Sequence, residues 1–495
     1  MKHIPRILVA IIIIAEVCLT PAAALTANEG GYIYDEWGKS VPAPAAYLLT
    51  NVVSGQSCGT TAFSEPQDLF HDGTHIYISD TNNNRIVVMT TDFRLVREID
   101  SIKNPEDGVM ELNQPSGVFV DEGGALYICD TGNQRVLKLD ADLNCQMILT
   151  KPDTELLGEE AQFRPLKVVV NRSKNILVVA DGIYMGFVNY DHNGVFQGFF
   201  GGNRVEVTAQ VIARHLWKNI FSEAQIEAST RTLPIEYSNA FIHDDLIYAV
   251  VRVSTTSLDE LKKLNSRGAN ILRFRNKGRR YPQNDFGDLE KTYKNGVPDD
   301  NWFVAVDVNE QGNIAMLDAN RGHVFIYDKD CNLMFITAGK GIDGLMQPAD
   351  IIHNGDNYLV LDSGAGNIKE YSPTPYAQKV NTALLYYQNN EHQKANEIWN
   401  DILKYYSNSR FAYHGLGKAS FQQGDFQQAC AYFKMAGKRQ EYSVAFREYR
   451  KQLLRQNIFW IIPVTLAAII LLRFIIRFFI RWMGYNLKKR KVRFR

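Results

Sequence analysis

The sequence predicts an all-β propeller of six blades, followed by an all-α segment and a single transmembrane helix. The first observation is a repeated phrase, since residues 78–86 read ISDTNNNRI and residues 128–136 read ICDTGNQRV. The second is a series of short segments that alternate apolar and polar residues between turns rich in Gly or Asn, which is typical of β-hairpins. The third is a change to helical periodicity near residue 377, with an apolar stretch near the end of the chain.

The repeated phrase defines one structural unit. Weaker copies contain Asp181, Asp318 and Asp362, and a Pro-containing strand precedes most copies, at Pro66, Pro115, Pro165 and Pro348. A third strand begins near the Arg of the phrase and a fourth follows it. Four-stranded antiparallel units at a spacing of roughly 45–50 residues cannot bury both of their faces alone, so they are expected to pack radially as propeller blades.

These motifs resemble the NHL-repeat β-propellers. The resemblance covers roughly residues 66–372 and is specific in blades one, two, five and six. Blade three lacks the Asn-x-Arg half of the phrase, and blade four, around residues 245–249, is recognised by its place in the series. We assign residues 28–376 to the propeller. Because the sixth unit runs out of strands before the chain becomes helical, residues 46–55 are expected to complete that blade.

The two ends of the chain predict export and anchoring. Lys2 and Arg6 precede an apolar run, and Ala22 to Ala24 form a small-residue cleavage site, so residues 1–24 read as a signal peptide. Residues 457–483 are predicted to form the transmembrane helix and 484–495 a basic cytoplasmic tail, because residues 473–495 hold nine Lys/Arg and no acid. The predicted location is the cell membrane, single-pass, with everything between signal and anchor outside the cytoplasm.

The charge balance excludes one class of partner. The formal net charge is +0, but the basic tail contributes many of the cations, so the exported part is acidic. An acidic ectodomain does not favour nucleic acid as a partner.

The helical segment, 377–456, carries a second repeat. Tyr387, Ala395 and Trp399 are echoed 34 residues later by Phe421, Ala429 and Phe433. This period resembles a pair of tetratricopeptide (TPR) repeats, which implies a groove that receives a segment of a partner protein. Exposed positions of that groove, Lys394 and Gln428, are candidate partner-binding residues.

A ring of polar residues is predicted at one mouth of the propeller channel. The same hairpin position of successive blades is occupied by His71, Asp121, Asn171, His243, Asn309 and His353. These six are the candidate ligand-binding residues. Three histidines could also hold zinc, but the position equally suits any polar hairpin residue, and we predict no metal. The recurrent Asp of the repeated phrase is expected to cap its turn by accepting backbone N–H bonds.

No catalytic residue is predicted. Lyases of the NHL type, which this propeller resembles, place a catalytic His in the Pro-x-Gly segment, where this chain has Gln67, Ser116, Leu166 and Ala349. Related lactonases use Glu, Asn and Asp around a central divalent ion, and no convincing set is evident among Glu65, Asn171 and Asp318. The sequence therefore predicts no cofactor, and enzymatic activity is left as the less favoured alternative.

A further segment is a candidate for partner binding. Residues 207–221 have apolar residues at helical spacing, including Ile212 and Leu216. Such a helix would either bind a partner or fill a gap beside the irregular fourth blade. Aromatic residues that would suit a carbohydrate face, if they lie on loops, are Tyr32, Tyr34, Trp37, Tyr184 and Trp302.

The sequence thus predicts a membrane-anchored, extracytoplasmic binding or scaffold protein that recognises protein or carbohydrate. The combination of NHL propeller, TPR repeats and anchor is similar to bacterial companions of transport systems, and this resemblance implies a membrane-proximal partner such as a component of an ABC-type sugar importer. The alternative is an extracytoplasmic lactonase- or lyase-like enzyme that uses the propeller mouth.

Overall fold

A computed structural model describes residues 30–35, 37–104, 108–157, 162–183, 185–202, 236–252, 260–272, 286–289, 292–294, 297–299, 301–340 and 344–492. The predicted signal peptide, 1–24, and the segment that contains Ile212 and Leu216 lie outside these residues. The chain divides into two compact units, Met1–Gln378 and Lys379–Arg495, and each is considered by itself.

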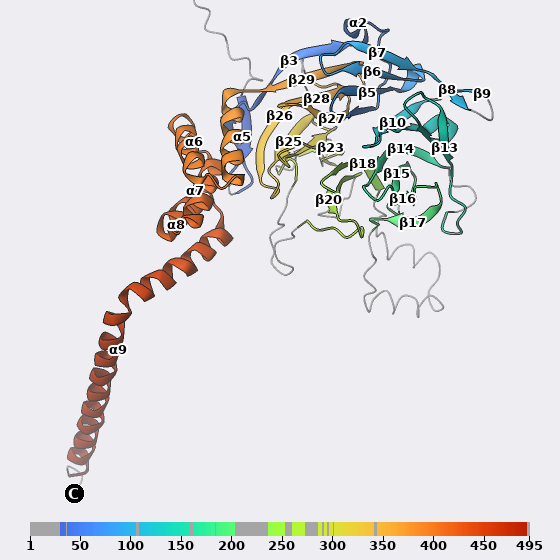
Figure 1. Ribbon diagram of the computed structural model, residues 1–495. Helices are drawn as coiled ribbons and strands as arrows, with labels where there is room; N and C mark the ends of the chain where they lie inside the picture. Colours follow the sequence, from blue (N-terminus) through green and yellow to red (C-terminus); the bar gives the residue numbers. More distant parts are fainter. Residues whose placement is uncertain are drawn as a thin grey trace, which may run out of the picture. The chain divides into compact units, whose positions relative to one another are not determined.

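The first unit is a six-bladed propeller, which confirms the predicted fold class (Figure 1). Blades one, two, three and five are four-stranded antiparallel sheets whose strands follow chain order. Their strands are β4 (Asp68–His71), β5 (His75–Asp80), β6 (Arg85–Thr90) and β7 (Leu95–Ile99); β10 (Pro115–Val120), β11 (Leu126–Asp130), β12 (Arg135–Leu139) and β13 (Cys145–Leu149); β14 (Arg164–Val170), β15 (Ile176–Asp181), β16 (Phe187–Tyr190) and β17 (Phe196–Phe200); and β23 (Phe303–Val308), β24 (Ile314–Asp318), β25 (His323–Tyr327) and β26 (Leu333–Ala338).

Blade four differs from these blades in its number of described strands, and blade six differs in its strand order. Blade four shows three strands within the described residues, β18 (Glu236–His243), β19 (Leu246–Arg252) and β20 (Leu261–Leu264). Blade six contains β27 (Pro348–Asn354), β28 (Asn357–Asp362) and β29 (Asn367–Pro373), and its fourth strand is β3 (Tyr47–Ser54) from the start of the chain. The outer edge that the sixth unit leaves open is therefore paired.

The first unit also contains short elements in addition to the blades. Three two-stranded sheets pair β1 (Gly30–Tyr34) with β2 (Ser40–Pro44), β8 (Ser101–Asn104) with β9 (Gly108–Glu111), and β21 (Thr292–Lys294) with β22 (Val297–Asp299). Single helical turns are α2 (Gly55–Cys58), η1 (Thr81–Asn83) and η2 (Thr131–Asn133).

The hydrophobic core lies between the blades. Successive clusters of buried side chains join blade six to one, one to two, two to three, three to four, and four to five. Polar contacts add to them, because the Thr81 hydroxyl donates to the carbonyl of Pro115 at 2.8 Å and the Thr131 hydroxyl to that of Pro165 at 2.5 Å. Each blade is thus stabilised mainly by its neighbours.

The first strand of most blades carries a bulge just after its Pro or aromatic residue, as at Pro115/Gly117 and Pro165/Lys167. Adjacent first strands approach closely there. A Cβ on Gly117 would lie 2.4 Å from the carbonyl oxygen of Leu166, so this position of blade two requires glycine.

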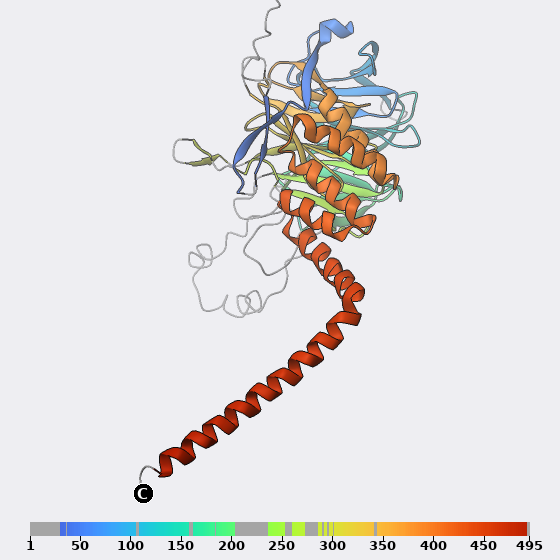
Figure 2. The ribbon, with the colours of Figure 1, turned by 90° about the vertical axis from the view of Figure 1, so that its left-hand side faces the viewer.

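The second unit is helical. Its helices are α5 (Pro375–Gln388), which begins in the first unit, α6 (His392–Tyr405), α7 (Arg410–Gln422), α8 (Phe426–Met435) and α9 (Arg439–Val492) (Figure 2). Trp399 and Phe433 are buried, and a Cβ on Gly415 or Gly417 would clash with Trp399 or Phe433, respectively. This close packing of α6, α7 and α8 is compatible with TPR repeats, whose assignment stays a prediction.

The last helix contains one candidate membrane span. α9 has 54 residues, and the part Arg439–Met483 is long and apolar enough to cross a bilayer. Its first turns pack on α8, with Ala445 fully buried. The chain therefore ends in a helix suited to membrane anchoring, while the side of the membrane on which each end lies stays a prediction.

The pairing of β3 with β29 can be tested at Val53. Its side chain is 3% exposed between blades six and one. Replacing Val53 with Asp should destabilise the propeller by about 3 kcal/mol, because the carboxylate would be buried without a partner. The measurement is the melting temperature of the full chain. Val52→Asp is the matched control, since the neighbouring side chain is 48% exposed; equal falls for both variants would contradict the closure.

Candidate functional site

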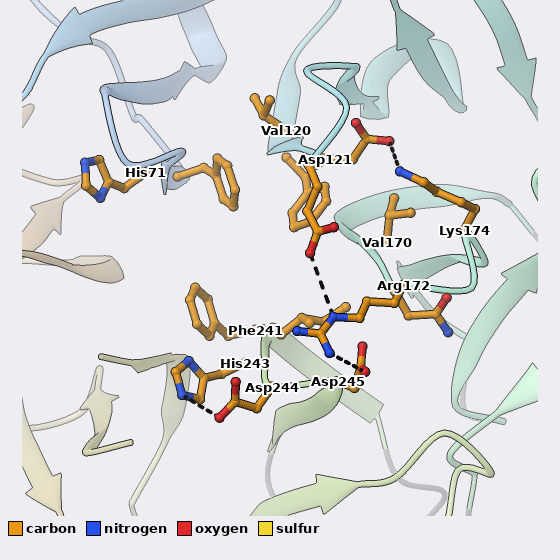
Figure 3. Close-up of a pocket in the computed structure, with 15 residues that line it drawn as sticks. His71, Val120, Asp121, Val170, Arg172, Lys174, Phe241, His243, Asp244 and Asp245 are labelled. Carbon is orange, nitrogen blue, oxygen red and sulfur yellow. Dashed lines mark hydrogen bonds and ion pairs between the residues drawn. The ribbon is translucent and has the colours of Figure 1, made fainter. Parts of the chain in front are cut away.

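The six predicted ring residues lie at corresponding places in the six blades. Each stands at the end of the first strand of its blade or immediately after it, where that strand turns into the second. Four of them, His71, Asp121, Asn171 and His243, line one pocket of about 280 Å³ (Figure 3). The other two, Asn309 and His353, do not line it. Ligand binding by this ring stays a prediction.

The pocket has an aromatic lining that sequence reasoning missed. Phe70, Phe119 and Phe241 come from the first strands of blades one, two and four. The ring centroids of Phe70 and Phe119 are 4.9 Å apart. Aromatic walls with a few polar groups around them are the usual composition of small-ligand sites.

Charged side chains surround this aromatic lining (Figure 3). Arg172 lies between Glu122 at 3.9 Å and Asp245 at 2.9 Å, so it joins the hairpins of blades two, three and four. Lys174 pairs with Asp121 at 3.2 Å. Arg172 and Lys174 are also absent from the sequence prediction, although their position one and three residues after Asn171 would have indicated them.

Part of the polar ring stabilises turns. The Asp121 carboxylate accepts the backbone N–H groups of Gly123 and Ala125. Asn171 accepts the N–H of Asn175, and Asn309 accepts those of Gln311 and Asn313. These contacts explain why the position prefers Asp or Asn whether or not a ligand binds.

A second group at the mouth brings two of the predicted histidines together. The ring centroids of His71 and His353 are 6.4 Å apart, and His353 Nδ1 lies 2.8 Å from the fully buried carboxylate of Asp307. Burial and the nearby His353 lower the pKa of His71. Burial also lowers the pKa of His353, but the charge and hydrogen bond of Asp307 together with the charge of Glu310 raise it by more, so it lies above its usual value. Asp307 was not predicted from the sequence.

The described residues do not form an evident metal centre. Within them, no group of three His, Cys, Asp or Glu side chains is arranged to hold an ion. Asn171 and Asp318, considered for a lactonase-like ion, lie at opposite ends of their blades, because one follows a first strand and the other ends a second strand. The antiparallel topology therefore keeps them apart.

The channel itself contains a buried charged group. Lys167 contacts both Asp68 and Asp350, the latter at 3.3 Å. The carboxylates also accept backbone N–H groups, Asp68 from Val118 at 2.7 Å and Asp350 from Leu69 at 2.9 Å. These contacts join the first strands of blades one, two, three and six. Each charged residue stands two positions after a Pro of the repeat.

Burial and the neighbouring charges shift the pKa values of Asp68 and Lys167. Burial raises the pKa of Asp68 well above its ordinary value, although Lys167 lowers it, and Asp350 raises it further. Burial lowers the pKa of Lys167, but the two carboxylates raise it by more. The ammonium of Lys167 therefore balances negative charge that would be costly to bury alone.

The opposite ends of the blades hold the recurrent Asp residues. Asp80 accepts from the Ser64 N–H at 2.7 Å and from Arg85 Nε at 2.8 Å. Asp130 accepts in the same way from the Asn113 N–H at 2.8 Å and from Arg135 Nε at 2.7 Å. Each carboxylate thus binds the segment that precedes the first strand of its blade and the Arg that begins the third strand. The prediction that this Asp caps the turn after it is wrong for Asp80 and Asp130, because neither side chain accepts a backbone N–H of its own turn.

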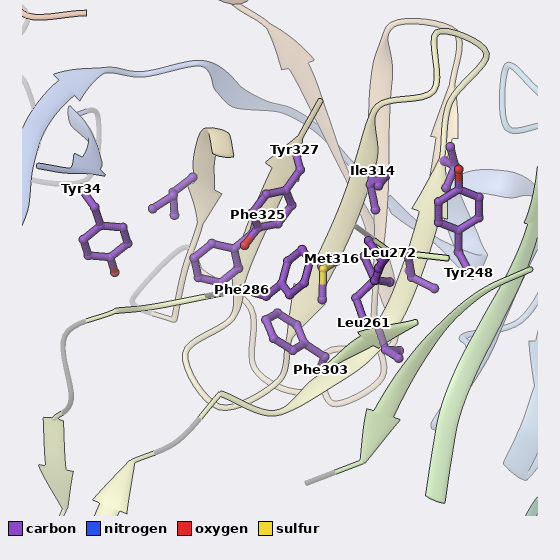
Figure 4. Close-up of a cluster of buried hydrophobic side chains, with 14 residues drawn as sticks. Tyr34, Tyr248, Leu261, Leu272, Phe286, Phe303, Ile314, Met316, Phe325 and Tyr327 are labelled. Atoms are coloured by element: carbon purple, nitrogen blue, oxygen red, sulfur yellow. The ribbon is translucent and has the colours of Figure 1, made fainter. Parts of the chain in front are cut away.

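A separate cluster fixes the start of the chain to blade five. The Asp288 carboxylate accepts from the hydroxyls of Tyr32 and Tyr34, lies 3.0 Å from His323 Nδ1 and pairs with Arg321 at 2.5 Å. Burial would raise the pKa of Asp288, but these donors hold it well below its ordinary value. Tyr34 also belongs to the apolar cluster between blades four and five (Figure 4).

The remaining predicted residues are dispersed. Tyr32 and Tyr34 have their hydroxyls engaged by Asp288, while Trp37 is 73% exposed; Tyr184 lies outside the described residues. Lys394 and Gln428 are exposed on α6 and α8, and Lys394 pairs with Glu391, the residue immediately before α6. Their exposure permits contact with a partner.

Residues 112–139 match the family model of the NHL repeat. The matched segment contains β10, β11 and β12 of blade two and the turn in which Asp130 binds Arg135. A comparison with curated protein sequences finds no match.

Solved structures match this chain at low identity and with low TM-scores. A catalytically inactive virginiamycin B lyase from Staphylococcus aureus with quinupristin is 10% identical, with a TM-score of 0.39, over 70% of this chain and 97% of that chain. A protein of unknown function from Bacteroides thetaiotaomicron VPI-5482 is 14% identical, with a TM-score of 0.40, over 70% and 83%. A protein provisionally described as a gluconolactonase is 12% identical, with a TM-score of 0.37, over 70% and 98%. Such values do not carry an activity over to this chain.

The buried charges of the channel can be tested at Lys167. Lys167→Met should lower the free energy of unfolding by roughly 3–5 kcal/mol near neutral pH, because two buried carboxylates lose their cation. The pKa of Asp68 is raised in the folded state. Protonation of Asp68 therefore stabilises the fold fully below its ordinary pKa of 3.8, and this stabilisation is lost as pH rises through the folded-state pKa. Lys167 lowers the pKa of Asp68, so its removal raises that pKa further, and the variant gains more stability than wild type when Asp68 binds a proton. The difference in free energy of unfolding between wild type and variant should therefore shrink on acidification to about pH 5.

The measurement for Lys167→Met is urea unfolding of the full chain at both pH values. The exposed Lys329 provides the control, and Lys329→Met should change the free energy of unfolding by no more than about 0.5 kcal/mol. Wild-type stability of Lys167→Met at both pH values would show that the ammonium does not balance the carboxylates.

Proposed function

We propose that this chain is a membrane-anchored binding protein that recognises a carbohydrate or a protein segment through the mouth of its propeller. The observation that carries the proposal is the pocket in which Phe70, Phe119 and Phe241 meet a rim of paired charges. The role is binding or scaffolding rather than turnover.

The composition of the pocket supports this role. Aromatic faces pack against the apolar faces of sugar rings or against apolar side chains, and the rim supplies donors and acceptors that orient the ligand. Arg172 and Lys174 are the donors, and Asp121, Asp244 and Asp245 are acceptors. A volume of about 280 Å³ is at the small end for ligand sites, so it suits one sugar unit or one side chain of a larger partner.

The location of the protein supports the choice of partner. The candidate span in α9 anchors the chain to a membrane, and the basic residues after it favour a cytoplasmic C-terminus, with the propeller and the TPR-like helices outside. A protein held in this way reaches membrane-proximal partners. Its resemblance to companions of transport systems supports an accessory role beside an ABC-type sugar importer.

A second candidate function is that of a lactonase- or lyase-like enzyme. The arrangement that favours it is the pair His353–Asp307 with His71 beside it, because the lowered pKa of His71 keeps that imidazole neutral and able to accept a proton. This candidate has fewer supporting groups than the binding role.

Binding at the mouth can be tested with Arg172. Arg172→Ala should weaken binding at least about tenfold, because it removes the cation that joins three hairpins of the rim. Binding would first be found with a glycan array and a peptide library and then measured by calorimetry on the full chain in detergent. Arg94→Ala is the control, since Arg94 is an exposed arginine that pairs with Asp92 outside the pocket.

Two results would contradict the binding role of the mouth. The first is equal affinity for wild type and Arg172→Ala. The second is hydrolysis or elimination of a lactone substrate that is lost in both His71→Ala and Asp307→Asn, which would favour the enzyme.

Partner recognition by the helices can be tested at Lys394 and Gln428. Changing both to Glu should reduce recovery of a membrane partner at least about fivefold. Both side chains are exposed, and the substitutions reverse the charge at Lys394 and add a negative charge at Gln428. The readout is quantitative co-purification from native membranes, with Ile212→Asp/Leu216→Asp as a second variant. Lys404→Glu is the control on the same helix as Lys394, and wild-type recovery from both test variants would contradict a scaffold role.

A further inference from the structure

The charged end of α9 points to a particular kind of membrane partner. This inference rests on the proposed function, in that α9 spans a bilayer. Residues 458–472 contain no charge, and aromatic residues suited to the two interfaces flank the apolar region, with Trp460 at one end and Trp482 at the other. At a rise of about 1.5 Å per residue these tryptophans are about 33 Å apart, which matches a hydrocarbon core of about 30 Å.

Three arginines lie within or beside this apolar region. Arg473, Arg477 and Arg481 recur every four residues and so share one face of the helix. Ile470, Arg473, Phe474 and Arg477 line one shallow groove on that face. The face is thus both apolar and cationic.

The depth of the arginines differs. Arg481 stands beside Trp482 at the interface, and Arg477 is near enough to extend its side chain there. Arg473 is about 13 Å from Trp482 and about 20 Å from Trp460 along the helix axis, close to the middle of the hydrocarbon core. A cation at that depth is costly unless a counter-charge meets it, and charged residues in membrane helices almost always face another helix or a polar cavity.

The helix itself does not supply that counter-charge, and Glu16, the acid in the N-terminal apolar stretch, belongs to the predicted signal peptide, which is removed from the mature protein. The sequence contains no Asp or Glu after Glu448. A second copy of α9, packed on the same face at the same depth, would bring arginine against arginine.

We propose that the groove formed by Arg473 and Arg477 is the docking surface for a transmembrane helix of a different protein, one that carries an Asp or Glu side chain near the middle of the bilayer. The partner's carboxylate pairs with Arg473, and its apolar residues pack beside Ile470 and Phe474. Charge complementarity sets the choice of partner, because a purely apolar helix would leave the guanidinium unpaired.

The test uses the full chain reconstituted in phosphatidylcholine vesicles and a synthetic transmembrane peptide of Leu and Ala with one central Asp. Energy transfer between labelled chain and peptide reports association. We expect the Asp peptide to associate at least about tenfold more tightly than the same peptide with Leu in place of Asp. Arg473→Leu should abolish that preference, and Arg481→Leu, at the interface, should retain it within about twofold.

Other outcomes separate this inference from the proposed anchor. Failure of the wild-type chain to float with vesicles and resist alkaline extraction would overturn both. Stable insertion with equal association of the Asp and Leu peptides would overturn only the docking surface. A preference for vesicles that contain phosphatidylglycerol, abolished by Arg473→Leu without any preference for the Asp peptide, would also overturn it and assign the arginines to anionic lipid headgroups.

Discussion

The pairing of β29 with β3 is the contact on which the rest of the propeller depends. A blade has two apolar faces and is stabilised by its neighbours, so a ring is complete only when its last blade presents a full face to its first. Val53 of β3 packs in the same cluster as Leu69 of blade one and Leu359 of blade six. The strand that closes the ring is therefore also part of the interface between the first and last blades.

Closure of the ring also brings charged side chains of the first strands together. Once the first strands surround a common axis, the residue two positions after Pro in each repeat meets its counterparts. Asp68, Lys167 and Asp350 occupy that position in blades one, three and six, and Gly117 occupies it in blade two. The same position of the repeat thus holds a buried charged group in blades one, three and six and a close backbone contact in blade two.

In the proposed function, ligand recognition and membrane attachment belong to different parts of the chain. The pocket at the mouth is built from the hairpins of blades one to four, and blade three supplies Asn171, Arg172 and Lys174. The helical unit contains the candidate span, and the proposed docking surface on it is formed by Arg473 and Arg477. The two proposals together describe a binding protein that assembles with a neighbour in one membrane.

The sequence by itself determined the number of blades, the hairpin position of the polar ring and the change from strands to helices, because each depends on local periodicity and turn residues. It did not determine the partners of Asp80 and Asp130, which accept N–H groups from the segments before the first strands and not from the backbone of the turns that follow them. Only the tertiary structure decided which ring residues share a pocket, which phenylalanines line it, and that Asp307 meets His353 while Asp288 meets Tyr32 and Tyr34. Those contacts join residues from different blades or from distant parts of the chain, and their distances are fixed by how the blades twist and pack around the axis, which no local pattern in the sequence records.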